Sequence, residues 1–230
     1  MDLKTYNDLH NSVMNCQNDQ CPRFKHFKPF LFKRLERSLD CVSVLFLSEE
    51  IPPNYHSLSY DEIFQHLTKK AIAQKGKVTK DICRMIGRPF NPTEDKFVYW
   101  TMAVKCIPYE RKYFKYHTCD RYCVDYLKNE IMLLPKLEYI VVYGKHALKT
   151  LRRINDYLPQ NLRKANIYTI ANSMPEEGFN MHFDNRNFKV IVLFHPSYSN
   201  IHYEKPTNFK ARRLKEMHEV IISSKVSSQS

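Results

Sequence analysis

The chain has 230 residues, enough for one medium-sized domain, and its 43% hydrophobic and 13% aromatic residues exclude a disordered protein. Its 36 Lys and Arg residues outnumber its 24 Asp and Glu residues, so the net charge of +12 favours a polyanionic partner such as nucleic acid. A basic surface without such a role is the alternative that the charge alone leaves open. No apolar stretch of about 18 residues predicts a membrane-spanning helix.

The amino-terminal residues carry Asp and Asn without an apolar run, so no secretory signal is predicted. Seven cysteines in a chain without such a signal predict a reducing compartment. There, thiols serve as metal ligands or buried side chains more often than they form disulfides. We therefore expect a cytoplasmic protein.

Predicted strands and helices alternate along the chain. Short apolar runs predict strands at residues 42–47, 97–104, 139–143 and 190–194. Apolar residues at helical spacing predict helices at residues 60–74, 123–134, 145–154 and 208–222. This alternation predicts one three-layer α/β domain over residues 1–222, with a central, mainly parallel sheet flanked by helices. We expect residues 75–95 and 155–189 to be long connections or insertions, and residues 223–230 to be a flexible tail.

Parallel sheets bind their ligands beyond the carboxyl ends of the strands. The residues that leave those ends here are Ser48-Glu49-Glu50, Lys105-Cys106, Gly144 and His195-Pro196-Ser197. Most of these sets carry groups that can act chemically, so a site is expected at this edge.

Four cysteines, Cys16, Cys21, Cys106 and Cys123, form two separated pairs whose soft thiolates would suit one iron–sulfur cluster or zinc. Cys119 is a rival for Cys123, whereas Cys41 and Cys83 are expected to be buried thiols.

The segment between Cys106 and Cys123 is rich in basic and aromatic residues. Its basic residues are Arg111, Lys112, Lys115 and Arg121. Basic side chains interleaved with aromatic rings predict a groove that follows phosphates and stacks on unpaired bases. The alternative is a solvated loop whose aromatic rings pack into the core.

Several segments resemble, in order, the uracil-DNA glycosylase superfamily. They are Cys21-Pro22-Arg23, residues 101–108 (TMAVKCIP), Cys123 with the helix that follows it, residues 140–144 (IVVYG), and His195-Pro196-Ser197 with Asn200. The similarity is greatest to the iron–sulfur branches, with family five the closer and family four next.

The resemblance implies a [4Fe-4S] cluster held by the four paired cysteines, with zinc as the competing metal. It implies a DNA repair enzyme that hydrolyses the N-glycosidic bond of uracil or another deaminated base and leaves an abasic site. No lysine nucleophile is suggested, so we expect a monofunctional enzyme that does not cleave the strand. We also expect it to be a monomer and to act on uracil-containing or single-stranded DNA. The alternative is a catalytically inactive relative that binds nucleic acid and keeps the cluster for structure.

The resemblance also implies roles for individual residues. His195 would donate a hydrogen bond to the uracil carbonyl oxygen, and Ser197, Tyr198 and Asn200 would lie on the loop that enters the duplex. Phe90 resembles a ring that stacks on the base, and Lys105 is expected to contact DNA.

The first active-site motif departs from the family pattern. Relatives have a glycine-rich turn after the first strand, whereas this chain has Ser48-Glu49-Glu50-Ile51-Pro52-Pro53. A backbone that must approach a base closely normally needs glycine. Glu49 matches the position of the family-four catalytic acid in this turn, and Glu50 is one residue away from that position. Asp61 lies near the position of the family-five aspartate. The identity of the catalytic carboxylate therefore stays open between Glu49 and Asp61.

Overall fold

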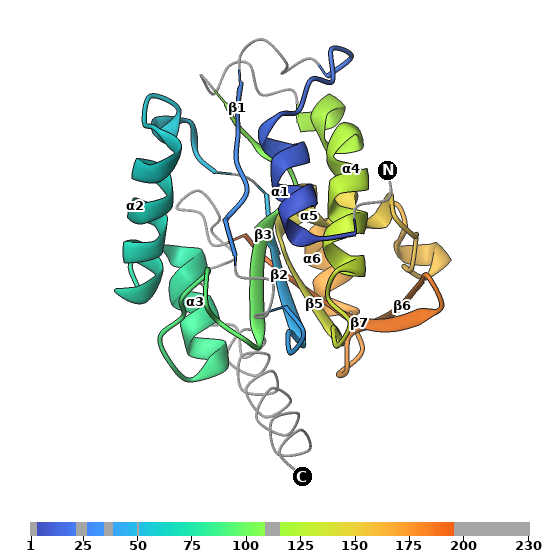
Figure 1. The fold of residues 1–230 in the computed structure, drawn as a ribbon. Coiled ribbons are helices and arrows are strands. Elements are labelled where there is room, and N and C mark those ends of the chain that lie inside the picture. Colours follow the sequence, from blue (N-terminus) through green and yellow to red (C-terminus); the bar gives the residue numbers. More distant parts are fainter. Residues whose placement is uncertain (1–3, 22–26, 35–38, 50, 109–115, 196–230) are drawn as a thin grey trace.

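The computed structural model describes residues 4–21, 27–34, 39–49, 51–108 and 116–195, with backbone alone at residues 27, 53, 108 and 116–120 (Figure 1). The predicted helix at 208–222 and the tail at 223–230 lie outside these residues. Within them, no helix is long and apolar enough to cross a membrane.

A five-stranded sheet forms the centre of the molecule (Figure 1). Its strands lie in the order β3 (Val98–Met102), β2 (Val44–Ser48), β5 (Tyr139–Tyr143), β7 (Arg186–Leu193) and β6 (Phe179–Phe183). The first four strands pair in parallel, and β6 runs antiparallel to β7. The expected α/β domain with a mainly parallel sheet is therefore confirmed.

Helices flank this sheet. They are α1 (Tyr6–Met14), α2 (Tyr60–Ile72), α3 (Lys77–Ile86), α4 (Tyr116–Met132), α5 (Gly144–Arg152) and α6 (Ile167–Asn172), with short 3₁₀ turns η2 (Pro53–Tyr55) and η4 (Gln160–Leu162). α5 lies on β2, β5 and β7, while α4 packs against α1 and α5. α2 and α3 pack on each other on the β3 side of the sheet (Figure 1).

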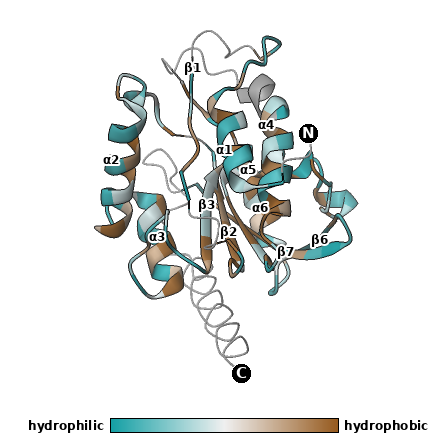
Figure 2. Cartoon of the chain, viewed as in Figure 1, coloured by the Kyte–Doolittle hydropathy of each residue, from teal (hydrophilic) through white to brown (hydrophobic). Residues whose placement is uncertain are grey.

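The core follows the apolar runs of the sequence. All five residues of β2 are buried, as are the last four residues of both β5 and β7. Figure 2 shows these strands as the hydrophobic centre, with polar residues on the outward sides of the helices. Strands covered on both faces need such continuous apolar runs, which is why the sequence predicts them well.

Two regions that we expected to be long connections contain regular structure, so that expectation is wrong. Residues 75–95 include α3, whose apolar residues Val78, Ile82 and Ile86 recur at helical spacing. Residues 155–189 include α6, β6 and the start of β7. Asp184 and Asn185, at φ 51° and 59°, form the two-residue turn between β6 and β7, in which Phe183 pairs with Arg186.

A second, two-stranded sheet pairs β1 (Phe27–Pro29) with β4 (Cys106–Pro108) in antiparallel orientation. The amide of Phe30 also donates to the carbonyl oxygen of Lys105 at 2.9 Å. This pairing fixes the amino-terminal segment beside the chain that leaves β3.

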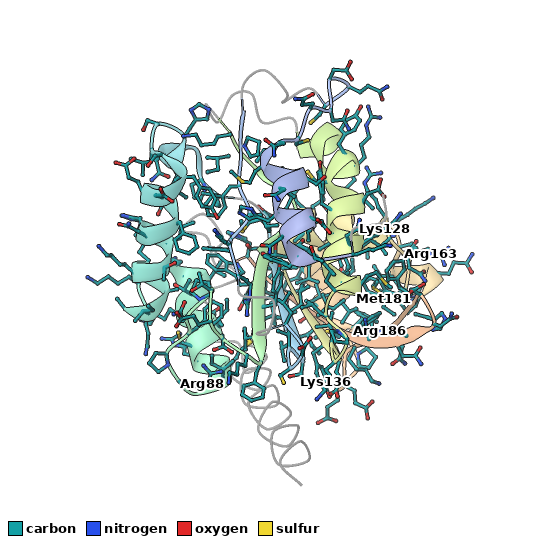
Figure 3. All side chains as sticks on the ribbon, viewed as in Figure 1. Arg88, Lys128, Lys136, Arg163, Met181 and Arg186 are labelled. Carbon is teal, nitrogen blue, oxygen red and sulfur yellow. The ribbon has the colours of Figure 1, made fainter. Side chains whose placement is uncertain are left out.

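At the amino-terminal end of the parallel strands, Arg186 at the start of β7 anchors the chain that leads into β5. Its guanidinium donates to the carbonyl oxygens of Leu134 at 2.7 Å and Pro135 at 3.2 Å. Lys136 lies at this same end (Figure 3), before β5 and away from the carboxyl ends of the strands.

Candidate active site

The four parallel strands end at one edge of the sheet, as the sequence predicts. β2, β5 and β7 lead directly to Glu49, Gly144 and Phe194-His195 at that edge. Ladder pairing continues past β2 and β3, because the amide of Val104 donates to the carbonyl oxygen of Glu49 at 3.0 Å. The backbone that carries Glu49 is thus held by the sheet.

Glu49 and His195 flank the same glycine. A Cβ atom at Gly144 would lie 2.7 Å from Glu49 Oε1 and 2.9 Å from His195 Cβ. Gly144 also has φ +86°, a conformation that residues with a Cβ rarely adopt. The absence of a side chain at Gly144 therefore leaves room for the Glu49 carboxylate and the Cβ atom of His195 against the same glycine.

His195 is partly buried, and this burial lowers its pKa below the ordinary value of 6.5. Burial has this effect because it disfavours the charged imidazolium. Near pH 7 the ring is therefore neutral, with one nitrogen as donor and the other as acceptor. Such a ring can donate a hydrogen bond to a developing anion.

A cavity of about 750 Å³ opens beside His195. Its walls include Trp100, Tyr55, Leu67 and Ser48. Trp100 Nε1 donates to Ser48 Oγ at 3.0 Å, and Ser48 Oγ donates to the carbonyl oxygen of Thr101 at 3.3 Å, so this wall is fixed to the sheet. An aromatic wall with a few polar groups is typical of a small-molecule or base-binding pocket.

The sequence model of a protein family, the uracil DNA glycosylase superfamily, matches residues 61–218, which is more than half of the chain. The chain belongs to the uracil DNA glycosylase superfamily. No curated protein matches it. The matched residues include Cys106, Cys123, Gly144 and His195, whereas Glu49 precedes them. The expected superfamily is confirmed, and the assignment to its iron–sulfur branches stays a prediction.

In this superfamily member Lys105 is not placed to contact DNA, so that prediction is wrong. Its side chain is 1% exposed and folds back along β3. The ammonium donates to Thr101 Oγ1 at 2.7 Å and to the carbonyl oxygen of Met102 at 2.6 Å, and it forms an ion pair with Glu130. Lys105 therefore joins β3 to α4 inside the core.

Glu130 completes this buried network. Its Oε1 accepts hydrogen bonds from Thr101 Oγ1 at 2.7 Å and from the hydroxyl of Tyr99. Burial, followed by the negative charge of Glu130, raises the pKa of Tyr99 well above its ordinary value. Tyr99 therefore stays protonated and donates.

Phe90 and Asp61 are also placed away from the cavity. Phe90 is fully buried and packs edge-on against Trp100, with 6.5 Å between the ring centroids, so it cannot stack on a base here. Asp61 is exposed in the first turn of α2, where a carboxylate is favoured by the helix dipole. Glu49, and not Asp61, is the acid that lies beside His195.

The fold gathers the four predicted cysteine ligands on one side of the molecule. Cys21 and Cys106 pack with Cys123 around Val104. The hydroxyl of Tyr126 in α4 donates to the carbonyl oxygen of Ser12 at 3.2 Å, which holds the end of α1 against α4. Burial, then a hydrogen bond with Cys16 and the charges of Cys16 and Cys123, raises the pKa of Tyr126. Cys16 therefore lies in the same neighbourhood.

These thiols form a suitable donor set without a completed metal geometry. Among the described side chains, no three His, Cys, Asp or Glu groups are arranged as a metal site, and no disulfide joins the described cysteines. Soft thiolates from three separate segments are the ligands that iron–sulfur clusters and structural zinc use. The cluster therefore stays a prediction, and the packing around Val104 agrees with it.

The cysteines outside the predicted ligand set differ in burial. Cys83 is buried as expected, with its thiol 3.9 Å from the carbonyl oxygen of Ala71, and burial raises its pKa. Cys41 is exposed, so its predicted burial is wrong. The side chain of Cys119 is not described.

Six of the predicted DNA contacts, Ser197, Tyr198, Asn200, Arg111, Lys112 and Lys115, lie outside the described residues. Arg121 is described and exposed, and its guanidinium lies 4.6 Å from the centroid of the Tyr122 ring. Its predicted contact with DNA stays a prediction.

Residues that sequence reasoning missed line the cavity wall. Trp100 lies in a predicted strand, where a buried position is the expected role, so nothing marked it as part of a site, whereas Ser48 was among the residues expected at the strand ends. Gly144 was among the residues expected at the strand ends, and a glycine between a buried strand and a helix indicates close approach of another group, here Glu49 and His195.

Proposed function

We propose that this protein hydrolyses the N-glycosidic bond of uracil, or of another deaminated base, in DNA. The observation that carries the proposal is that the Glu49 carboxylate and His195 both lie against Gly144. His195 also lines an open cavity, whereas Glu49 is outside its lining. Membership of the superfamily supports a glycosylase-type reaction on DNA.

His195 would stabilise the departing base. As the bond between the sugar C1′ and the base nitrogen breaks, its electron pair stays on the base, and negative charge builds on the carbonyl oxygen. A neutral imidazole donates a hydrogen bond there and gains strength as the charge grows. The lowered pKa of His195 supports this role, because the ring does not have to lose a proton first.

Glu49 would act on the water. Its carboxylate can orient a water molecule, accept one of its protons as the oxygen bonds to C1′, and offset positive charge on the sugar. The base leaves as an anion and takes a proton from solvent, and Glu49 then returns to solvent the proton that it accepted from the water, so atoms and charges balance. The sheet-held backbone of Glu49 supports the fixed placement that such a base needs.

The enzyme is favoured over the inactive binder by the turn after β2. This turn has no glycine, and a turn that filled the pocket would favour a protein that only binds nucleic acid. Instead Pro52, Asn54 and Tyr55 line the cavity, while Ile51 is buried. The cavity stays open toward His195, as catalysis requires.

We also propose that Cys16, Cys21, Cys106 and Cys123 hold one metal centre, a [4Fe-4S] cluster in preference to zinc. When bound, it would supply structural cross-linking between the amino-terminal segment, β4 and α4. The packing of Cys21, Cys106 and Cys123 around Val104 supports this placement.

The proposal is tested with oligonucleotides that carry uracil, hypoxanthine or xanthine, followed by alkaline cleavage of abasic sites. We expect cleavage after alkali and an intact strand without it, as for a monofunctional enzyme. His195→Ala should release base about 100-fold to 1,000-fold more slowly, whereas His182→Ala, an exposed histidine on β6, should match the wild type. Tight DNA binding without release of any base would select the inactive binder.

A further inference from the structure

The cavity beside His195 carries a concentration of positive charge. Lys70, Lys75, Lys77 and Lys80 all line it, and no Asp or Glu is among its described lining residues. The lysines come from α2, α3 and the turn between them. Four ammonium groups around one cavity repel one another unless an anion lies among them.

The backbone of the turn adds to this positive character. Gln74 has φ 54° and Gly76 has φ +101°, so the chain reverses tightly and places Lys75 and Lys77 on either side of the glycine. Gly76 is the N-cap of α3 and provides no side-chain cap. The first residues of α3, from Lys77 to Lys80, line the cavity, and the amino end of a helix adds partial positive charge to that of the lysines.

The same cavity is also lined by His195, the residue proposed to act on the base, and by Trp100 and Ser48. Trp100 and Ser48 lie on the sheet, and His195 follows β7. A nucleotide in this cavity would thus lie within reach of both His195 and the lysines. The lysines are placed to meet the phosphates that flank the base.

We infer that Lys70, Lys75, Lys77 and Lys80 form a binding site for the sugar–phosphate backbone of the strand that carries the target base. This inference rests on the proposed function for the identity of that strand. It assigns phosphate binding to the α2–α3 turn, in addition to the basic segment between Cys106 and Cys123. Lys70 has a second role, since its ammonium donates to the hydroxyl of Tyr55 at 2.9 Å and so supports the cavity wall.

The test compares the double variant Lys75→Ala/Lys80→Ala with Lys136→Ala/Lys164→Ala. All four lysines are exposed, but only the first two line the cavity, and Lys136 lies at the opposite edge of the sheet (Figure 3). The dissociation constant for a fluorescent, single-stranded, uracil-containing oligonucleotide is measured by anisotropy over a range of salt concentrations. Each lost contact with single-stranded DNA lowers the slope of log affinity against log salt by about 0.7.

For Lys75→Ala/Lys80→Ala we expect affinity to fall roughly tenfold at low salt and the slope to decrease by about 1.4. An unchanged slope and affinity, or an equal loss in Lys136→Ala/Lys164→Ala, would overturn the inference. Lower affinity and slope in a protein that releases no base would support it, although the proposed function itself would then fail.

Discussion

The carboxylate of Glu49 and the side chain of His195 approach from two different strands and converge on the Cα atom of Gly144. A single methyl group at that glycine would contact both, at 2.7 Å and 2.9 Å. The pair is therefore assembled by the parallel order of β2, β5 and β7, and the glycine between them makes the close approach possible.

Gly144→Ala should abolish most of the activity while leaving a folded protein. A left-handed backbone with a Cβ costs about 1–2 kcal/mol, which lowers the melting temperature. The methyl group also displaces Glu49 or His195, and a small misplacement of catalytic groups lowers the rate by roughly 100-fold. Melting temperature and single-turnover base release are measured on the same preparation.

Gly178→Ala is the matched control for this change. Gly178 also has a positive φ, +89°, and a Cβ there would lie 2.7 Å from the carbonyl oxygen of Val190. It should lower the melting temperature without slowing base release by the folded protein. Equal activity in the two variants would show that Gly144 has only a conformational role.

Lys105→Met should destabilise the fold and leave DNA affinity unchanged. Removing the ammonium leaves Glu130 buried without its counter-ion, which costs about 3–5 kcal/mol. Lys128→Met is the control, since its ion pair with Asp125 is exposed and contributes at most about 1 kcal/mol (Figure 3). Urea unfolding measures the free energy of unfolding of each variant. If Lys105→Met lowered DNA affinity without lowering stability, Lys105 would have to contact DNA after all.

Acid should destabilise the wild type more than a variant without the imidazole. The pKa of His195 is lower in the folded state than its ordinary 6.5, so the unfolded chain takes up a proton first as the pH falls. The contribution of His195 is fully present above about pH 6.5 and is lost as the pH falls through the folded pKa. Unfolding free energies of the wild type and His195→Asn at pH 7 and pH 5 measure this difference. If both proteins lost the same unfolding free energy between pH 7 and pH 5, a buried, neutral His195 would be contradicted.

Metal content should follow the paired cysteines. Cys106→Ser and Cys123→Ser should each lose iron, together with the brown absorbance of a cluster, while the exposed Cys41→Ser should retain both. Elemental analysis of anaerobically purified protein separates iron from zinc. Equal metal content in the Cys41→Ser and Cys106→Ser proteins would remove Cys106 from the ligand set.

Periodicity predicted the main sheet because β2, β5 and β7 are buried on both faces and so must be continuously apolar. It failed for β6, where Phe179 and Met181 alternate with exposed residues over only five positions. The turn at Asp184-Asn185 gave a weak signal, because Asn-Gly and Asp-Gly are the stronger signs of such a hairpin.

At the site, the sequence predicted which residues leave the strand ends but not where their side chains point. Lys105 follows a strand like Glu49 does, yet it folds back to Glu130, a partner 25 positions away that only the packing of α4 against the sheet brings close. The choice between Glu49 and Asp61 depended in the same way on a spatial neighbour, Gly144. The lysines of the α2–α3 turn were missed because the turn was taken for a connection.

The most direct test of a Glu49–His195 active site is single-turnover release of uracil by the wild type, Glu49→Gln and Asp61→Asn. A general base contributes about 100-fold to 10,000-fold, so Glu49→Gln should be slower by at least the smaller factor. Asp61→Asn should equal the wild type, because Asp61 is exposed on α2. Release by Glu49→Gln at the wild-type rate, or a loss confined to Asp61→Asn, would contradict the account.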